Sequence, residues 1–177
     1  MTKKYSIAFL TLQDISPLES IDIAAKTGYS HIGLRILPAI ENEFIYPIIS
    51  DKYLQKDILS ALDNTGIKIG DFELIRLNPD TKIEEFESFL ECANIFGVQN
   101  ATVVSDDPCI ERFTNNFAKL CEFAKPYNIY MNLEHLHLQP IHNLLHQHKL
   151  RLYVKESHQQ QLFVVHMYII SILHHLQ

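Results

Sequence analysis

The sequence predicts an α/β fold, a partial (βα) barrel of about five strands, from three observations. Apolar, strand-like runs alternate with helix-like segments over the first 134 residues. Gly28, Gly66 and Gly97 each follow a helix-like segment, which indicates a repeating strand–helix unit. One face of each strand-like run is apolar, and the other turns polar toward the carboxyl end. That pattern favours a barrel with a polar mouth over a sheet that helices cover on both faces.

Composition supports a single globular body of this kind. The chain has 177 residues, an apolar content of 47%, and few glycines and prolines. Its three cysteines are odd in number and widely spaced, so they form neither a disulfide framework nor a zinc motif, and a reducing cytoplasm is the expected location. The first apolar run is too short for a signal peptide and lacks a cleavage site, so it is interpreted as a strand.

The first unit has the clearest local signals. A strand is predicted over residues 5–12 and a helix over about 17–26. Ser16 can cap this helix and Glu19 completes a capping box, while Pro17 suits the first helical turn. These signals mark the start of the helix clearly.

The later units follow the same order. The second strand is predicted over 29–36, and a long loop leads to a helix over 51–64 that Ser50 would cap. The third strand covers 67–77. The remaining elements are a helix from the T-K-I-E capping box at 81–84 to Gly97, a strand over 99–105, a helix from Asp107 and Pro108 to about Lys125, and a strand from Asn128.

Alternation along these strands assigns the polar face, because side chains on a strand point to opposite faces in turn. The carboxyl ends of parallel strands meet at one edge, so these side chains are expected to line one mouth. The polar sets are His31, Gly33 and Arg35; Asp71 and Glu73; Asn100, Thr102 and Asp106; and Asn132 and Glu134.

Composition changes after Glu134, which divides the chain into an N-terminal barrel part, 1–134, and an atypical segment, 135–177. The first part holds 12 Lys and Arg against 20 Asp and Glu, and such an acidic body is a poor partner for nucleic acid. The second part holds nine of the ten histidines and six glutamines, but no Asp and no Gly. Its apolar run at 162–173 is too short to span a membrane.

Histidines in the second segment leave one further interpretation open. His142 and His146 are four residues apart, with His148 nearby, so a helical metal clip is conceivable. The spacing alone is a weak signal, because it lacks a glutamate or a third ligand at a recognised distance.

Several segments resemble the sugar phosphate isomerase/epimerase proteins, the xylose isomerase-like TIM barrels. They are Y-S-I-A-F-L-T-L, S-P-L-E-S-I-D-I-A-A-K-T-G-Y-S-H-I-G-L-R, T-G-I-K-I-G-D-F-E-L-I-R-L and I-Y-M-N-L-E. The resemblance covers about residues 5–134, roughly half of a barrel of about 250 residues. A truncated or frame-shifted gene would explain the missing strands, and the other two reading frames after the Glu134 codon would test this.

The resemblance implies a divalent metal (Mn, Mg or Zn) at the barrel mouth, with Glu134 as a metal ligand and catalytic group. The other ligands, an Asp, a His and a second Glu, would come from later strands, and no position in 135–177 matches them. The implied chemistry is metal-dependent proton transfer next to the carbonyl of a sugar or sugar phosphate.

Other candidates each have a structural alternative. Glu73 could be a second catalytic carboxylate or an ion-pair partner, and Arg35 and Arg76 could bind substrate or hold the fold together. His31 is interpreted as a satisfied interior histidine, whereas Asp106 and Asp107 are interpreted as helix-capping residues.

Two functions from different classes remain open. One is a sugar phosphate isomerase/epimerase-like protein with impaired catalysis. The other is a non-catalytic barrel fragment that self-associates, or binds a partner, through open sheet edges.

Overall fold

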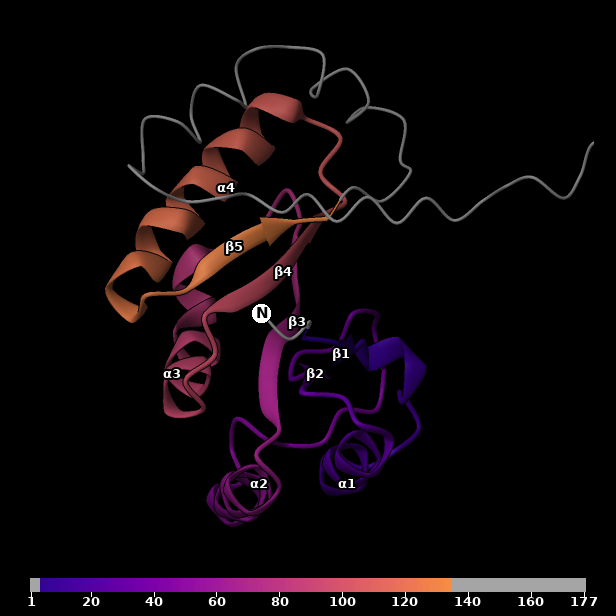
Figure 1. Ribbon diagram of the computed structural model, residues 1–177. Helices are drawn as coiled ribbons and strands as arrows, with labels where there is room; N and C mark the ends of the chain where they lie inside the picture. The colour runs from indigo at the N-terminus through magenta and orange to yellow at the C-terminus, as the bar shows by residue number, and fades with distance from the viewer. Residues whose placement is uncertain (1–3, 135–177) are drawn as a thin grey trace, which may run out of the picture.

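The computed structural model describes residues 4–134, which form five parallel strands alternating with four α-helices. The strands lie in the order β1-β2-β3-β4-β5, so each new strand pairs with the one before it in the chain. Over the described residues the sheet is open, and the four helices follow its outer side in chain order (Figure 1). The predicted fold class, an α/β partial barrel, is confirmed.

The sequence signals place most elements within two residues of their observed bounds. The strands are β1 Ser6–Ile7, β2 His31–Arg35, β3 Lys68–Leu77, β4 Asn100–Ser105 and β5 Tyr130–Leu133. The α-helices are α1 Pro17–Thr27, α2 Lys52–Thr65, α3 Glu87–Ile95 and α4 Ile110–Ala124, and the 3-10 turns are η1 Phe9–Thr11, η2 Ile83–Phe86 and η3 Lys125–Tyr127.

The hydrophobic core lies between the sheet and the helices. Phe72 of β3 is fully buried and makes edge-to-face contacts with Phe89 of α3 and with Phe96, at centroid distances of 6.0 and 5.9 Å. Other fully buried core residues are Ile21, Ile32, Ile58, Leu90, Val103, Phe113 and Leu120. Since this apolar layer uses one face of every strand, the other face is left for polar side chains.

Helix ends follow the predicted signals at α1 and at the glycines. The Ser16 hydroxyl accepts a hydrogen bond from the Glu19 N–H at 3.2 Å. Gly28, Gly66 and Gly97 all adopt a left-handed backbone with φ between 66° and 80°, which residues with a Cβ rarely adopt. These glycines therefore end α1, α2 and α3 as expected.

The predicted caps of α2 and α3 are wrong. Asp51, not Ser50, caps α2, because its carboxylate accepts hydrogen bonds from the N–H groups of Tyr53 and Leu54. The T-K-I-E segment forms no capping box, since Thr81 accepts from the Asn78 N–H and a 3-10 turn precedes α3. The first error arose where two adjacent polar residues, Ser50 and Asp51, could cap the same helix.

The first and fifth strands are shorter than predicted. The N–H groups of Thr11 and Leu12 donate to the carbonyls of Ala8 and Phe9, so a 3-10 turn replaces the expected continuation of β1. Asn128 has a left-handed backbone, and β5 begins two residues after it.

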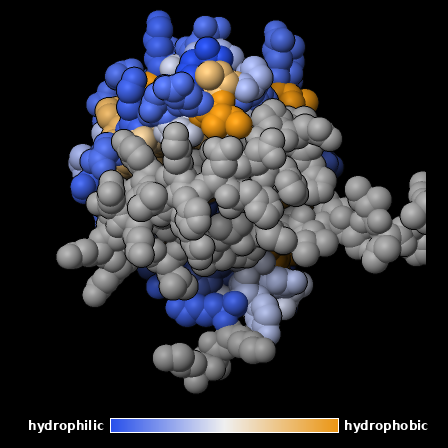
Figure 2. All heavy atoms as spheres, turned by 90° about the horizontal axis from the view of Figure 1, so that it is seen from above, coloured by the Kyte–Doolittle hydropathy of each residue, from blue (hydrophilic) through white to orange (hydrophobic). Residues whose placement is uncertain are grey.

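The surface of the described part carries only scattered apolar groups. In Figure 2 the visible described atoms are mostly hydrophilic, with small apolar patches between them. Exposed apolar side chains such as Leu10, Ile40 and Phe44 lie in loops and turns, and others are spread over α1, α2 and α3. No helix within residues 4–134 is long and apolar enough to cross a membrane.

Candidate functional site

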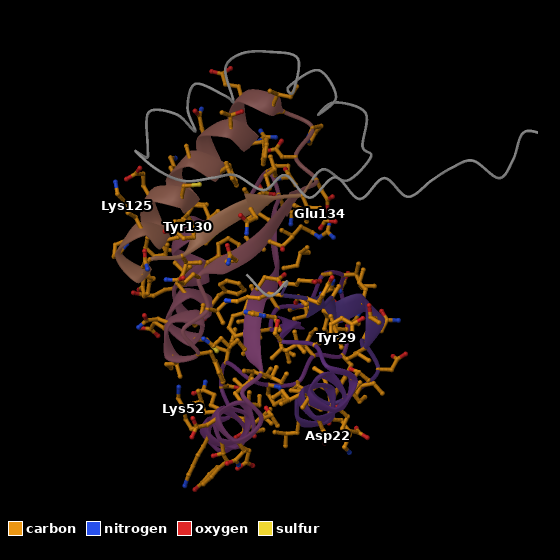
Figure 3. All side chains as sticks on the ribbon, viewed as in Figure 1. Asp22, Tyr29, Lys52, Lys125, Tyr130 and Glu134 are labelled. Carbon is orange, nitrogen blue, oxygen red and sulfur yellow. The ribbon has the colours of Figure 1, made fainter. Side chains whose placement is uncertain are left out.

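The carboxyl ends of the strands bring the predicted site residues to one edge of the sheet. Arg35 ends β2 and is in register with Glu73 of β3. Arg76 lies three residues further along β3 and is in register with Val104 of β4. Glu134 follows β5 directly, and Figure 3 shows it at the carboxyl end of that strand, opposite the end that carries Tyr130. The Glu134 N–H donates to the Val103 carbonyl at 2.8 Å, which fixes its backbone to β4.

Arg35 is the centre of a buried ion-pair cluster. Its two terminal nitrogens donate to Glu43 Oε1 at 2.9 Å and to Glu73 Oε2 at 3.0 Å. The Arg35 side chain is only 8% exposed, and its guanidinium lies 4.5 Å from the centre of the Phe9 ring. A charge this deeply buried requires paired, hydrogen-bonded partners, and the two carboxylates supply them.

Glu43 belongs to the long loop between β2 and α2, residues 36–50, and ties it to the sheet. Its second oxygen accepts a short hydrogen bond from the Ala39 N–H. Burial acts to raise the pKa of Glu43, but the hydrogen bonds from Ala39 and Arg35 outweigh it and hold that pKa below its ordinary value. Glu43 is therefore ionised at neutral pH.

Arg76 also binds the loop 36–50. Its Nε donates to the Ala39 carbonyl at 2.8 Å, and a terminal nitrogen pairs with Asp106 at 2.5 Å. Arg35 and Arg76 thus both have structural partners in the loop and the neighbouring strand. Their predicted role in binding substrate stays a prediction.

A second polar cluster lies on the polar face of the sheet, the face that does not pack against the helices. Thr102 donates to Asp71 at 3.4 Å, and the side chain of Asn132 donates to that of Asn100 at 3.3 Å. Gly33 lies beside this cluster: a Cβ there would stand 3.1 Å from Asp71 Oδ1. The glycine therefore makes room for the carboxylates of β3 at the mouth.

His31 lies at the amino end of β2, away from the mouth. Its ring Nδ1 shares a hydrogen bond with the Ser30 hydroxyl at 2.8 Å, in agreement with the predicted satisfied histidine. Burial lowers the pKa of His31, and the positive charges of Lys4 and Lys68 lower it further. His31 is accordingly neutral at pH 7.

The capping roles predicted for Asp106 and Asp107 need correction. Asp106 pairs with Arg76, and Cys109 occupies the N-cap position of α4. Asp107 instead accepts a hydrogen bond from the Cys109 N–H and holds Arg112 through two contacts of 2.7 Å. Its buried carboxylate joins the end of β4 to the first turns of α4.

We expect Asp107→Asn to destabilise the protein more at pH 7 than at pH 3. The hydrogen bonds from Arg112 lower the pKa of Asp107 most; burial opposes them, and the Cys109 N–H adds to them. A carboxyl group whose folded pKa lies below its unfolded value of about 3.8 stabilises the fold above that pH, and this stabilisation is lost as pH falls through the folded pKa. Urea unfolding of both proteins across this pH range measures the difference. A difference that is constant with pH would contradict the prediction, and Asp22→Asn, at an exposed ion pair, is the control.

The described residues do not make a complete metal site. Within residues 4–134, no group of three or more His, Cys, Asp or Glu side chains lies close enough together to hold a metal ion. Glu134 supplies one carboxylate at the mouth, and Glu73 is engaged by Arg35. The histidines proposed as a metal clip, His142, His146 and His148, lie outside the described residues.

Glu43 is the one member of the buried cluster that sequence reasoning missed. Only the E-N-E segment of the loop signalled it, and acidic loop residues are common. Its partner is eight residues away along the chain, so no helical or strand periodicity connects the two.

Comparisons with known proteins identify the fold. No protein-family model matches the chain, and no curated protein does. A xylose isomerase domain-containing protein of Salmonella typhimurium LT2 matches with a TM-score of 0.62 at 14% identity, over 77% of this chain and 51% of that one. A sugar phosphate isomerase/epimerase of Parabacteroides distasonis matches with a TM-score of 0.51 at 17% identity, over 76% and 51%. The IolI protein, solved with a bound zinc atom, matches with a TM-score of 0.55 at 18% identity, over 75% and 51%.

These matches define the chain first as part of a parallel (βα) barrel. More narrowly, its fold is that of the xylose isomerase-like TIM barrels, as the sequence resemblance predicted. The chain spans about half the length of these solved structures. Identities of 14–18% establish the shared fold, and fold alone does not decide the reaction.

Proposed function

We propose that this chain is a sugar isomerase/epimerase-like barrel part that presents half of a sugar-binding mouth and is impaired in catalysis. Glu134 is the proposed metal ligand and catalytic group, and Glu73 is a second catalytic carboxylate. Arg35 and Arg76 are proposed to face a sugar or sugar phosphate, in a cytoplasmic protein. The observation that supports the proposal is the position of these residues at or near the carboxyl ends of β2, β3 and β5, the end of the strands at which barrels of this fold bind substrate.

The geometry supports binding more directly than turnover. Arg35 holds the Glu73 carboxylate in one position, and the sheet fixes the Glu134 backbone. Guanidinium and carboxylate groups on rigid strand ends can orient the hydroxyl groups of a sugar. The described donor set is too small to hold a divalent ion, so no reaction step through a metal follows from it.

We expect no turnover above background on ketoses or their phosphates, with Mn²⁺, Mg²⁺ or Zn²⁺ added in turn. A single carboxylate does not fix the position of an ion, and a displacement of about 1 Å at a reacting centre already costs roughly 100-fold in rate. Assays of the full chain with each metal, beside Glu134→Gln, test this. Metal-dependent turnover that disappears in Glu134→Gln would contradict the impairment and restore a full enzyme role.

A second candidate function is self-association of a non-catalytic barrel fragment. The open sheet over residues 4–134, with β1 and β5 as its outer strands, favours it. A closed barrel pairs all its strands, whereas an open sheet leaves backbone groups on its outer strands available to another chain.

We therefore expect the chain to sediment as oligomers whose average mass rises with protein concentration. Analytical ultracentrifugation over at least a tenfold range of concentration measures this. A single monomeric species at every concentration, together with cooperative thermal unfolding, would refute the self-association.

A further inference from the structure

Arg35 differs from the other described arginines in how its guanidinium is used. Its side chain is 8% exposed, compared with 25% for Arg76 and 45% for Arg112. Guanidinium groups have five N–H donors, and the buried Nε of Arg35 has no hydrogen-bond partner among the described residues. Arg35 therefore retains unused capacity to bind an acceptor, in a position where water is excluded.

A small pocket at the carboxyl ends of β1 and β2 leads to this group. Its walls come from the end of β1, from η1 and the segment that follows it to the start of α1, from β2, and from the loop 36–50. They include Phe9, Gly33, Arg35, Phe44 and Tyr46. The pocket thus combines apolar and aromatic walls with one buried cation, a composition typical of sites for small ligands with an acidic group.

Glu43, next to the lining residue Phe44, supplies Arg35 with a carboxylate from the protein itself. Glu43 and Glu73 both bind Arg35, but Glu73 belongs to a central strand, and Glu43 comes from a loop. The Glu43 side chain is 22% exposed, and its neighbour Phe44 is 76% exposed. Of the two carboxylates, Glu43 is therefore the one that can leave without breaking the sheet.

We propose that Arg35 is an anion-binding site, that Glu43 occupies it in the free protein, and that a phosphate or carboxylate group of a ligand replaces Glu43. The exchange keeps an anion beside Arg35, because one anion leaves its Nη1 as another arrives. It also moves the loop 36–50, since Glu43 holds the Ala39 N–H as well. The inference deepens the proposed function by assigning an acidic group to the ligand, and it requires neither a metal nor turnover.

The protein contains no tryptophan, so Phe44→Trp places a single fluorescent reporter beside Glu43. We expect inorganic phosphate, added to this variant at constant ionic strength, to change the Trp emission saturably. When Glu43 occupies the site in most molecules, the apparent affinity for phosphate is the intrinsic affinity multiplied by the fraction of molecules in which the site is open. Glu43→Gln in the same background should therefore lower the half-saturating phosphate concentration by roughly 10- to 1,000-fold, the range for an open state of 0.1–10%.

Matched variants separate this mechanism from general charge effects. Glu111→Gln removes the same charge on the exposed side of α4 and should leave phosphate binding unchanged. Arg35→Lys keeps the positive charge but loses the planar fork, so it should weaken binding in the Glu43→Gln background. A parallel titration with acetate shows whether the site takes carboxylates as well as phosphates.

The proposal is overturned if Glu43→Gln binds phosphate no better than Glu111→Gln, or if Arg35→Lys leaves binding unaltered. If Glu43→Gln does not fold, the phosphate titration of the Phe44→Trp protein with native Glu43 tests the proposal instead. A saturable response that Arg35→Lys abolishes supports the exchange, and the lack of any saturable response refutes it. Since neither metal nor sugar is present, failure here leaves the proposed role of Glu134 to be tested separately.

Discussion

Phe72→Ala should lower the free energy of unfolding by about 3–5 kcal/mol, the range for removing a fully buried aromatic ring. Phe72 has no exposed surface, and it joins the central strand β3 to α3 through its contacts with Phe89 and Phe96. The alanine would leave a cavity between the sheet and its helices and remove two edge-to-face ring contacts. Because domains are stable by only about 5–15 kcal/mol, this variant should lie close to unfolding at 37 °C.

Urea denaturation followed by circular dichroism measures the loss. Phe44→Ala is the matched control, because the same ring is removed from a side chain that is 76% exposed. Its effect should stay within about 0.5 kcal/mol. A comparable loss in both variants would mean that Phe72 does not occupy a packed core.

Arg35→Met is expected to destabilise the protein by about 3–5 kcal/mol, the usual cost of removing one partner from a buried ion pair. Methionine retains much of the apolar stem but leaves Glu43 and Glu73 without their cation. Leaving Glu73 unpaired costs more than leaving Glu43 unpaired, because the Glu73 side chain is only 14% exposed and its strand cannot move away.

The double variant Arg35→Met/Glu73→Gln provides the internal check. Neutralising Glu73 removes the uncompensated buried charge, so the double variant should be more stable than Arg35→Met alone. Equal stability of the two variants would show that the charge of Glu73 is solvated by other means. The same unfolding assay at pH 7 serves for all three proteins.

The sequence predicted the repeating architecture because its signals are local. Glycines that end helices, the Ser16 cap and the apolar faces of the strands depend on neighbours within a few residues. No partner for Glu73 was predicted from the sequence, but strand parity had placed it and Arg35 on the polar face of adjacent strands. Prediction of this part of the site thus needed only the alternation of side chains and the order of the strands.

Errors occurred where two neighbouring residues could fill the same role, or where the true partner lies far away along the chain. Asp51 prevails over Ser50 as a cap because its carboxylate reaches two backbone N–H groups at once. Asp106 forms an ion pair with Arg76, thirty residues earlier in the chain, and no local sequence pattern predicts such a pair. Glu43 escaped notice for the same reason, because a loop residue acquires its partner only when the loop folds over the sheet.

The chain-order arrangement of the strands also bears on how the protein is made. Each strand from β2 onward pairs with the strand synthesised just before it, so no strand needs to wait for a distant segment. During translation, every new strand–helix unit can dock onto an edge that already exists outside the ribosome. The growing polypeptide therefore always presents one fresh edge, and its exposure to chaperones should move along the chain as synthesis proceeds.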